Sequence, residues 1–298
     1  MERMKKRMEK DKKEKIKPRS EYNNLESYDD EVDIVEDVLA AAEEAEDEIL
    51  FALEEALHKL CELYKDWFPF YFPNGVLNRD EYNKLILSLQ DGSQINTAIS
   101  EALDEIKKDI EDLEQQRLLS FLIFDYEMTK DQTIKSIGDK GPKLMYNPYV
   151  KNKRPTQDIV KQPWCKDHKS FVVRIRDNVQ NLDMRLRAVI IKGFANGWSP
   201  QKMGEFFRQL TGMEAYKAQR LLRTEAMAAY SRATKEAYLE KGIKYVEIIG
   251  DAACGGICLD YVGEAIPLEE AEIGDLLPPY HPNCACSFCS YDSFDENF

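Results

Sequence analysis

Apolar residues recur at spacings of three or four along much of this chain, and this periodicity constrains the fold more than any other feature of the sequence. From Val35 to Leu60 one set of apolar residues recurs at spacings of three or four, which predicts a long amphipathic helix with a very acidic outer face. The set is Val35, Val38, Ala42, Ala45, Ile49, Leu53, Leu57 and Leu60. The same reasoning predicts further helices over residues 81–89, 95–122, 173–193, 200–211 and 214–241. We therefore expect an α+β protein that is predominantly helical, with long N-terminal helices.

Proline and glycine residues predict where these helices begin and end. The pair Ser199-Pro200 offers a capping hydroxyl followed by proline at the first helical position, so a helix should begin there. Residues 193–198, with a glycine at position 193 and another at 197, should form the break before it. Gly212 should end the helix that begins at Pro200.

The last fifty residues have a different character. Residues 244–249 alternate and are β-branched, which predicts a strand, and the residues after it are rich in glycine and proline. We expect a compact C-terminal α+β module with a Cys/His-rich loop. The whole chain then divides into a flexible basic and polar tail (1–30), a helical N-terminal region (31–128), an irregular linker (129–170) and a C-terminal domain (171–298).

Five of the seven cysteines lie between residues 254 and 289, in a segment with few apolar side chains to form a core. Two groups of potential ligands separated by a loop can close a tetrahedral zinc site, and the metal would fix a segment that cannot fold by apolar burial alone. The candidate ligands are Cys254, Cys258, His281, Cys284 and Cys286, with Cys289 beyond them. More candidates exist than a zinc ion needs, and either Cys284 or Cys286 could complete the set. The alternative is a group of buried free thiols.

Arg223-Thr224-Glu225 lies inside the alanine-rich helix expected over 214–241. Residues two apart point to different sides of a helix, so Arg223 and Glu225 cannot pair with each other. Each should reach a separate partner, for example the strand or the Cys-rich loop.

Charge is segregated along the chain, although the net charge is −14. Residues 21–60 are strongly acidic and residues 151–244 strongly basic, and no Lys or Arg follows Lys244. The basic segment could face DNA or an acidic protein surface, or it could be balanced by the acidic segments of the same chain. The candidate contact residues are Lys151, Lys153, Arg154, Arg174 and Arg176. No apolar run is long enough to predict a membrane span.

Several short motifs occur in a fixed order in the second half of the chain: Arg223-Thr224-Glu225, Tyr238, Gly242-Ile243, Gly250-Asp251, Cys254, Cys258, Gly263-Glu264 and the run from Pro278 to Cys286. This order resembles the minor head proteins of tailed bacteriophages, the F-like head morphogenesis proteins of phage Mu and their relatives in phage SPP1. The resemblance covers about residues 180–290. Ala285 stands where the family pattern has arginine, which removes a cation that could touch DNA.

The resemblance implies a protein of the virion, located inside the head at the portal vertex. Its implied partners are the portal protein, capsid or scaffold proteins and packaged DNA. Its implied role is in head assembly and in DNA packaging or ejection, by binding and without catalysis. The alternative is an enzyme on the same scaffold, such as a metal-dependent nuclease or a toxin-like domain, whose chemistry would have to come from Glu225, Asp251 and His281.

Overall fold

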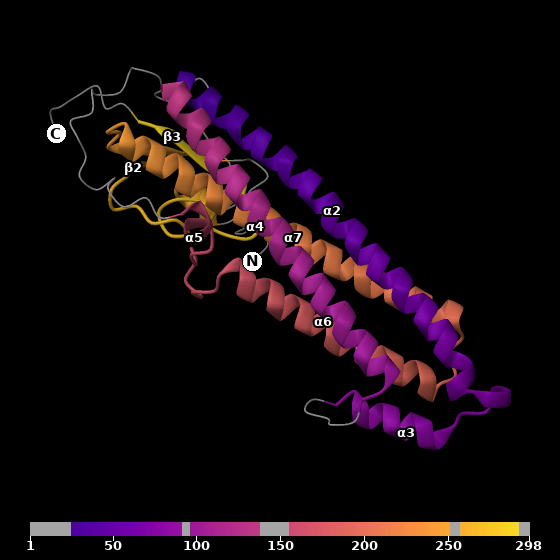
Figure 1. The fold of residues 1–298 in the computed structure, drawn as a ribbon. Coiled ribbons are helices and arrows are strands. Elements are labelled where there is room, and N and C mark those ends of the chain that lie inside the picture. Colours follow the sequence, from indigo (N-terminus) through magenta and orange to yellow (C-terminus); the bar gives the residue numbers. More distant parts are fainter. Residues whose placement is uncertain (1–24, 91–95, 138–154, 251–256, 292–298) are drawn as a thin grey trace, which may run out of the picture. The chain divides into compact units, whose positions relative to one another are not determined.

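The computed structural model describes residues 25–90, 96–137, 155–250 and 257–291 (Figure 1). Four long helices dominate this part of the chain, namely α2 (Leu25–Tyr71), α4 (Ala98–Ile137), α6 (Phe171–Ala195) and α7 (Pro200–Glu240). Two shorter helices, α3 (Arg79–Ser88) and α5 (Thr156–Val160), lie between them in sequence. The strands β1 (Tyr245–Ile249), β2 (Ala265–Pro267) and β3 (Ser287–Ser290) form a small sheet near the C-terminus. The predominantly helical α+β class is therefore confirmed.

The start of α7 follows the sequence signs that predicted it, and α3 has a side-chain cap that was not predicted. The Ser199 hydroxyl accepts a hydrogen bond from the Lys202 N–H at 3.3 Å, and α7 begins at the proline that follows. The Asn78 side chain caps α3 in the same way, accepting from the N–H of Glu81 at 3.4 Å. These caps satisfy N–H groups that have no partner inside the helix.

Two glycines behave differently from expectation. Gly212 does not end a helix, because α7 runs without interruption from Pro200 to Glu240. Gly193 lies within α6, and the break begins only after Ala195. A glycine occupies position 193 because the chain is closely packed there, and a Cβ on Gly193 would lie 2.0 Å from the terminal methyl of Met203.

The helix α4 also continues nine residues beyond position 128, into the segment expected to be an irregular linker. Apolar periodicity ends there because polar side chains take the buried positions. Asp125, Thr129 and Thr133 follow one another at spacings of four, and all three are fully buried. On the neighbouring face, the Lys130 ammonium contacts carboxylates of Glu236 at 2.6 Å and Glu240 at 2.8 Å, both on α7.

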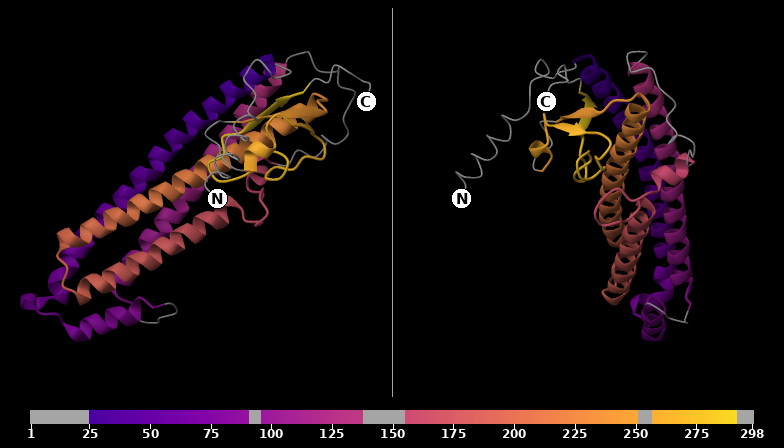
Figure 2. Two further views of the ribbon diagram at one scale, coloured as in Figure 1. Left: turned by 180° about the vertical axis from the view of Figure 1, so that it is seen from behind. Right: turned by 90° about the vertical axis from the view of Figure 1, so that its left-hand side faces the viewer.

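The sheet has the order β2-β1-β3, and both pairings are antiparallel. The predicted strand over 244–249 is its central strand, β1, in which Val246 pairs with both Ile266 and Ser290. In both views of Figure 2 the sheet lies beside the C-terminal part of α7. Tyr238 of α7 and Phe288 of β3 belong to the apolar core beneath the sheet, where their rings meet edge to face at 6.1 Å.

The chain separates into two compact units, and several long helices contribute to both. The first unit comprises residues 1–44, 119–171 and 220–298, and it contains the sheet. The second comprises residues 45–118 and 172–219, and its core includes Tyr64, stacked on Phe194 at 4.7 Å. In the part of the chain that the structure describes, no helix has the length and apolar character needed to cross a bilayer.

Candidate metal centre

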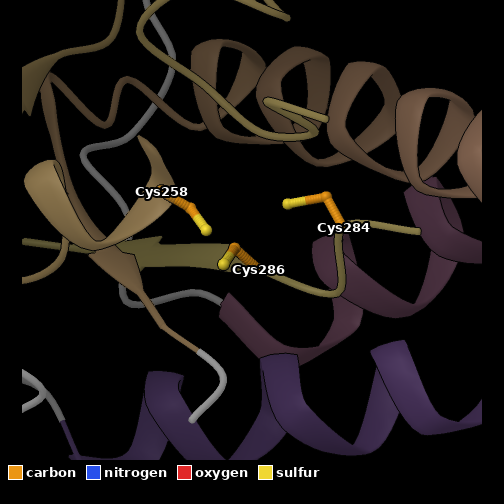
Figure 3. Close-up of side chains that lie close together, drawn as sticks. All are labelled: Cys258, Cys284 and Cys286. Atoms are coloured by element: carbon orange, nitrogen blue, oxygen red, sulfur yellow. The ribbon is translucent and has the colours of Figure 1, made fainter. Parts of the chain in front are cut away.

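Three of the clustered cysteines meet in the first unit. The Sγ atoms of Cys258, Cys284 and Cys286 all lie within 4.8 Å of one another, and the three side chains are buried. Figure 3 shows the sulfur atoms pointing toward one another from two separate chain segments. Such a group of buried thiols could hold a metal ion, because neighbouring thiolates can share one cation.

Contacts with the sheet fix the position of the first of these cysteines, Cys258. Cys258 lies in a short 3-10 helix, η5 (Ile257–Asp260), which is followed by a turn back to the central strand. The N–H of Gly263 donates to the Ile248 carbonyl at 3.1 Å, and Val262 forms a bridge with the same residue of β1. The central strand therefore fixes the position of the 3-10 helix and its thiol.

Hydrogen bonds to α7 fix the positions of the other two cysteines, Cys284 and Cys286. Immediately before Cys284, the N–H of Asn283 donates to the Thr224 hydroxyl at 3.0 Å. Immediately after Cys286, the Ser287 hydroxyl is hydrogen-bonded to the phenol of Tyr230. Both partners lie on α7, so two hydrogen bonds to one helix hold the chain on either side of the cysteine pair.

His281 lies next to the thiol cluster. Its Nε2 atom is 3.3 Å from Cys258 Sγ, and its Nδ1 atom is 2.9 Å from the carbonyl oxygen of Pro282. Because a carbonyl oxygen only accepts, Nδ1 must carry the proton that it donates, and Nε2 is left with its lone pair facing the thiol. A carbonyl in this position is the usual orienting partner of a metal-binding imidazole.

Cys258, Cys284 and Cys286 thus form a group of three thiols that could hold a metal ion, and His281 offers an imidazole nitrogen beside one of them, outside the group whose ligand atoms all lie within 4.8 Å of one another. Three thiolates and one imidazole are a donor set found in tetrahedral zinc sites, in which Zn–S distances are about 2.3 Å and Zn–N distances about 2.0 Å. Both members of the Cys284 and Cys286 pair belong to the cluster, whereas Cys289 lies apart on β3, in a small apolar cluster with Ile249. Cys254 lies outside the described residues, as does Asp251.

Tyr280 closes one side of the cluster. It packs against the three cysteines, its ring is stacked on Tyr261 at 4.8 Å, and its hydroxyl donates to the Leu276 carbonyl at 2.9 Å. Burial, followed by the negative charge of Cys286 and Cys284, raises the pKa of the Tyr280 phenol above its ordinary value. The phenol therefore stays protonated and keeps its role as a donor.

The Arg223-Thr224-Glu225 motif contacts three different segments. Arg223 and Glu225 reach separate partners, as their spacing predicted, but these are Glu43 and Trp164, and it is Thr224 that reaches the Cys-rich loop. Arg223 pairs with Glu43 of α2 at 3.2 Å, although both side chains are substantially exposed. Thr224 binds the cysteine loop as described, and its hydroxyl also donates to the Arg220 carbonyl at 2.5 Å. Glu225 is buried and accepts from the Trp164 indole N–H at 3.0 Å. A carboxylate so placed holds a structural element and has little access to a substrate.

The basic contact candidates are only partly described. Lys151, Lys153 and Arg154 lie outside the described residues. Arg174 is half-buried on α6, while Arg176 is exposed and its Nε atom lies 3.2 Å from the Glu111 carboxylate. These positions identify no nucleic-acid surface.

Sequence reasoning missed Trp164, Tyr230 and Ser287, which fix the surroundings of the site. Each is a single polar contact between segments far apart in sequence, and no spacing pattern predicts such a contact. The chain matches no model of a known protein family, no curated protein and no solved structure.

Proposed function

We propose that Cys258, His281, Cys284 and Cys286 bind one zinc ion, and that this ion holds the C-terminal module together. The observation that carries the proposal is the convergence of three buried thiols, with the imidazole Nε2 of His281 3.3 Å from one of them. Four protein ligands fill a tetrahedral site, which leaves no position for a substrate and is typical of structural sites.

The charge of the surrounding sequence supports a cation at this place. Residues 245–298 contain no Lys or Arg, so the module itself offers no basic side chain to stabilise three neighbouring thiolates. A divalent metal supplies that positive charge. It also supplies the free energy that a small, glycine- and proline-rich segment lacks.

Elemental analysis of the purified full-length protein, combined with thiol titration, tests the zinc site. We expect one zinc per chain and three thiols that become reactive only after chelation. A metal-free protein that is folded, with Cys258, Cys284 and Cys286 reactive from the start, would contradict the proposal.

We further propose that the protein is a minor head protein of a tailed bacteriophage, which binds at the portal vertex inside the head and acts in head assembly and in DNA packaging or ejection without turnover. The motifs that resemble this family support the proposal. They lie far apart in the sequence, yet Thr224 of one motif binds the backbone of Asn283 in another at 3.0 Å. Motifs that serve to build a common module in this way suit a protein that works by binding.

A pull-down tests this role. The full-length chain, purified without chelator, would be immobilised and offered the portal protein encoded in the same phage genome. We expect retention by the wild type and by Cys61→Ser, and weaker retention by the double variant Cys258→Ser/Cys284→Ser. Failure of the zinc-loaded wild type to retain portal protein would argue against the proposed role but leave the zinc site standing.

A further inference from the structure

Residues 155–169, here called the strap, contain α5 and lead into α6. The strap is fastened to α7 through its backbone. The Arg232 guanidinium donates to the carbonyl of Ile159 at 3.2 Å and to that of Gln162 at 2.6 Å. These contacts hold the first half of the strap on the surface of the helix.

Trp164 holds the second half of the strap against α7 and the C-terminal module. Its indole N–H donates to the buried Glu225 carboxylate on α7 at 3.0 Å. Its backbone lies against Gly274 in the C-terminal module, where a Cβ would come within 2.6 Å of the Trp164 carbonyl oxygen. Next to this contact, Lys166 pairs with Asp275 at 3.1 Å. The strap is therefore in contact with α7 and with the loop that contains Gly274.

The strap is connected to the candidate metal centre in two ways, through the loop that contains Gly274 and through α7. The first connection runs along the chain. The Gly274 N–H donates to the Leu277 carbonyl at 2.8 Å, and the hydroxyl of Tyr280, the residue before His281, donates to the Leu276 carbonyl at 2.9 Å.

The second connection runs through α7. Thr224 binds the loop of the cysteine pair, and the next residue, Glu225, binds Trp164. The ligand loop and the strap thus share one turn of α7 and one stretch of the module.

We propose that metal binding at this centre controls the docking of the strap. The inference depends on the proposed zinc site. With the metal bound, the segment from Gly274 to Cys286 has a single conformation and presents Gly274 to Trp164. Without it, the segment gains conformational freedom, and the strap loses one of the two surfaces on which it lies. Binding of the metal at the cysteine cluster then determines whether the strap stays docked, which makes the strap a metal-responsive element.

The first test uses the thermodynamic linkage between metal binding and docking of the strap. If the metal favours the docked strap, then a change that loosens the strap must weaken metal binding by the same factor. We expect Trp164→Phe, which removes the indole donor and leaves every proposed ligand in place, to lower zinc affinity roughly threefold to tenfold in competition with a chromophoric chelator. The matched control is Trp198→Phe, in the second unit, which should bind zinc as the wild type does.

Hydrogen exchange of the full-length protein gives the second test. Chelation should speed exchange in peptides from the strap roughly tenfold, at amides such as that of Gln162, which is bonded within the strap at 3.1 Å. Peptides from α3 should not change, and added zinc should restore protection.

The outcomes are distinct. Loss of protection at residues 281–286 on chelation, with no change in the strap and unaltered zinc affinity of Trp164→Phe, would overturn the inference and leave the zinc site intact. Faster exchange in α3 as well would also overturn it, because the response would be general unfolding. Absence of bound zinc in the wild type would overturn both the zinc site and the inference.

Discussion

The backbone N–H of Asn283 donates to the hydroxyl of Thr224 at 3.0 Å, although 59 positions separate the two residues. Asn283 has a positive φ of 58° and stands between His281 and Cys284, so the turn that joins these two candidate ligands is held by a side chain of α7. The helix α7 thereby sets the position of the loop that contains His281, Cys284 and Cys286.

The cysteines should differ sharply in their response to substitution. Cys258→Ser, Cys284→Ser and Cys286→Ser each remove a thiolate ligand and should abolish stoichiometric zinc binding and lower the melting temperature, because metal binding and folding of the module are coupled. Cys289→Ser removes a buried thiol that lies outside the cluster and should keep zinc at the wild-type level. Elemental analysis and thermal melts check both expectations. Equal loss of zinc in all four variants would contradict the ligand set.

The fourth ligand can be identified by comparing His281→Gln with Cys254→Ser. His281 Nε2 lies 3.3 Å from Cys258 Sγ, so we expect its replacement to weaken zinc binding on the order of tenfold or more, while Cys254→Ser has little effect. Competition with a chromophoric chelator measures both affinities. The reverse order of effects would assign the fourth position to Cys254.

Thr224 should matter through its hydroxyl. Thr224→Val keeps the shape of this buried side chain but leaves the Asn283 N–H without its acceptor, and we expect a loss of about 1 kcal/mol of stability together with weaker zinc binding. Thr224→Ser keeps the hydroxyl and should restore most of both. Urea unfolding of the zinc-loaded proteins is the measurement, and a valine variant that is as stable as the wild type and binds zinc as tightly would show that the hydroxyl is not what matters.

The helices could be predicted from sequence wherever apolar side chains take the buried positions. This holds for α2, where Val38, Ala42, Ile49, Leu53 and Leu60 are all buried at the predicted spacing. It fails at the end of α4, because Asp125, Thr129 and Thr133 occupy the buried face and apolar periodicity disappears while the helix continues. A pattern that counts only apolar residues cannot detect a helix whose interior face is polar.

The residue types of the candidate metal centre could be predicted from the sequence, but their arrangement in space could not. The crowding of cysteines near His281 indicated a metal site, since few apolar residues are available there. The choice among the cysteines depends on the turn at Asn283 and on the pairing of β1 with β3, which separates Cys289 from the cluster by placing it opposite Glu247. Contacts such as Tyr230 with Ser287 join positions 57 apart and leave no trace in local sequence.

Glu114 should make the stability of the protein fall as the pH rises. It is buried on α4 in the second unit, near Glu214, whose carboxylate accepts from Lys217 at 2.8 Å. Burial, then the charge of Glu214, raises the pKa of Glu114 from 4.5 to about 8, with Lys217 opposing the shift. Because the folded protein holds this proton more tightly than the unfolded chain, the stabilisation is complete below the unfolded pKa and is lost as the pH passes through the folded value. The slope from one such group is at most about 1.4 kcal/mol per pH unit.

Glu114→Gln tests this assignment, because glutamine fills the same volume and does not ionise. We expect the free energy of unfolding of the wild type, measured in urea between pH 5 and pH 9, to fall with pH, and that of the variant to fall much less. Glu105→Gln, an exposed position on the same helix, is the control and should keep the wild-type slope. A wild-type protein that becomes more stable over this range, or a Glu114→Gln variant with an unchanged slope, would show that Glu114 is ionised in the folded protein.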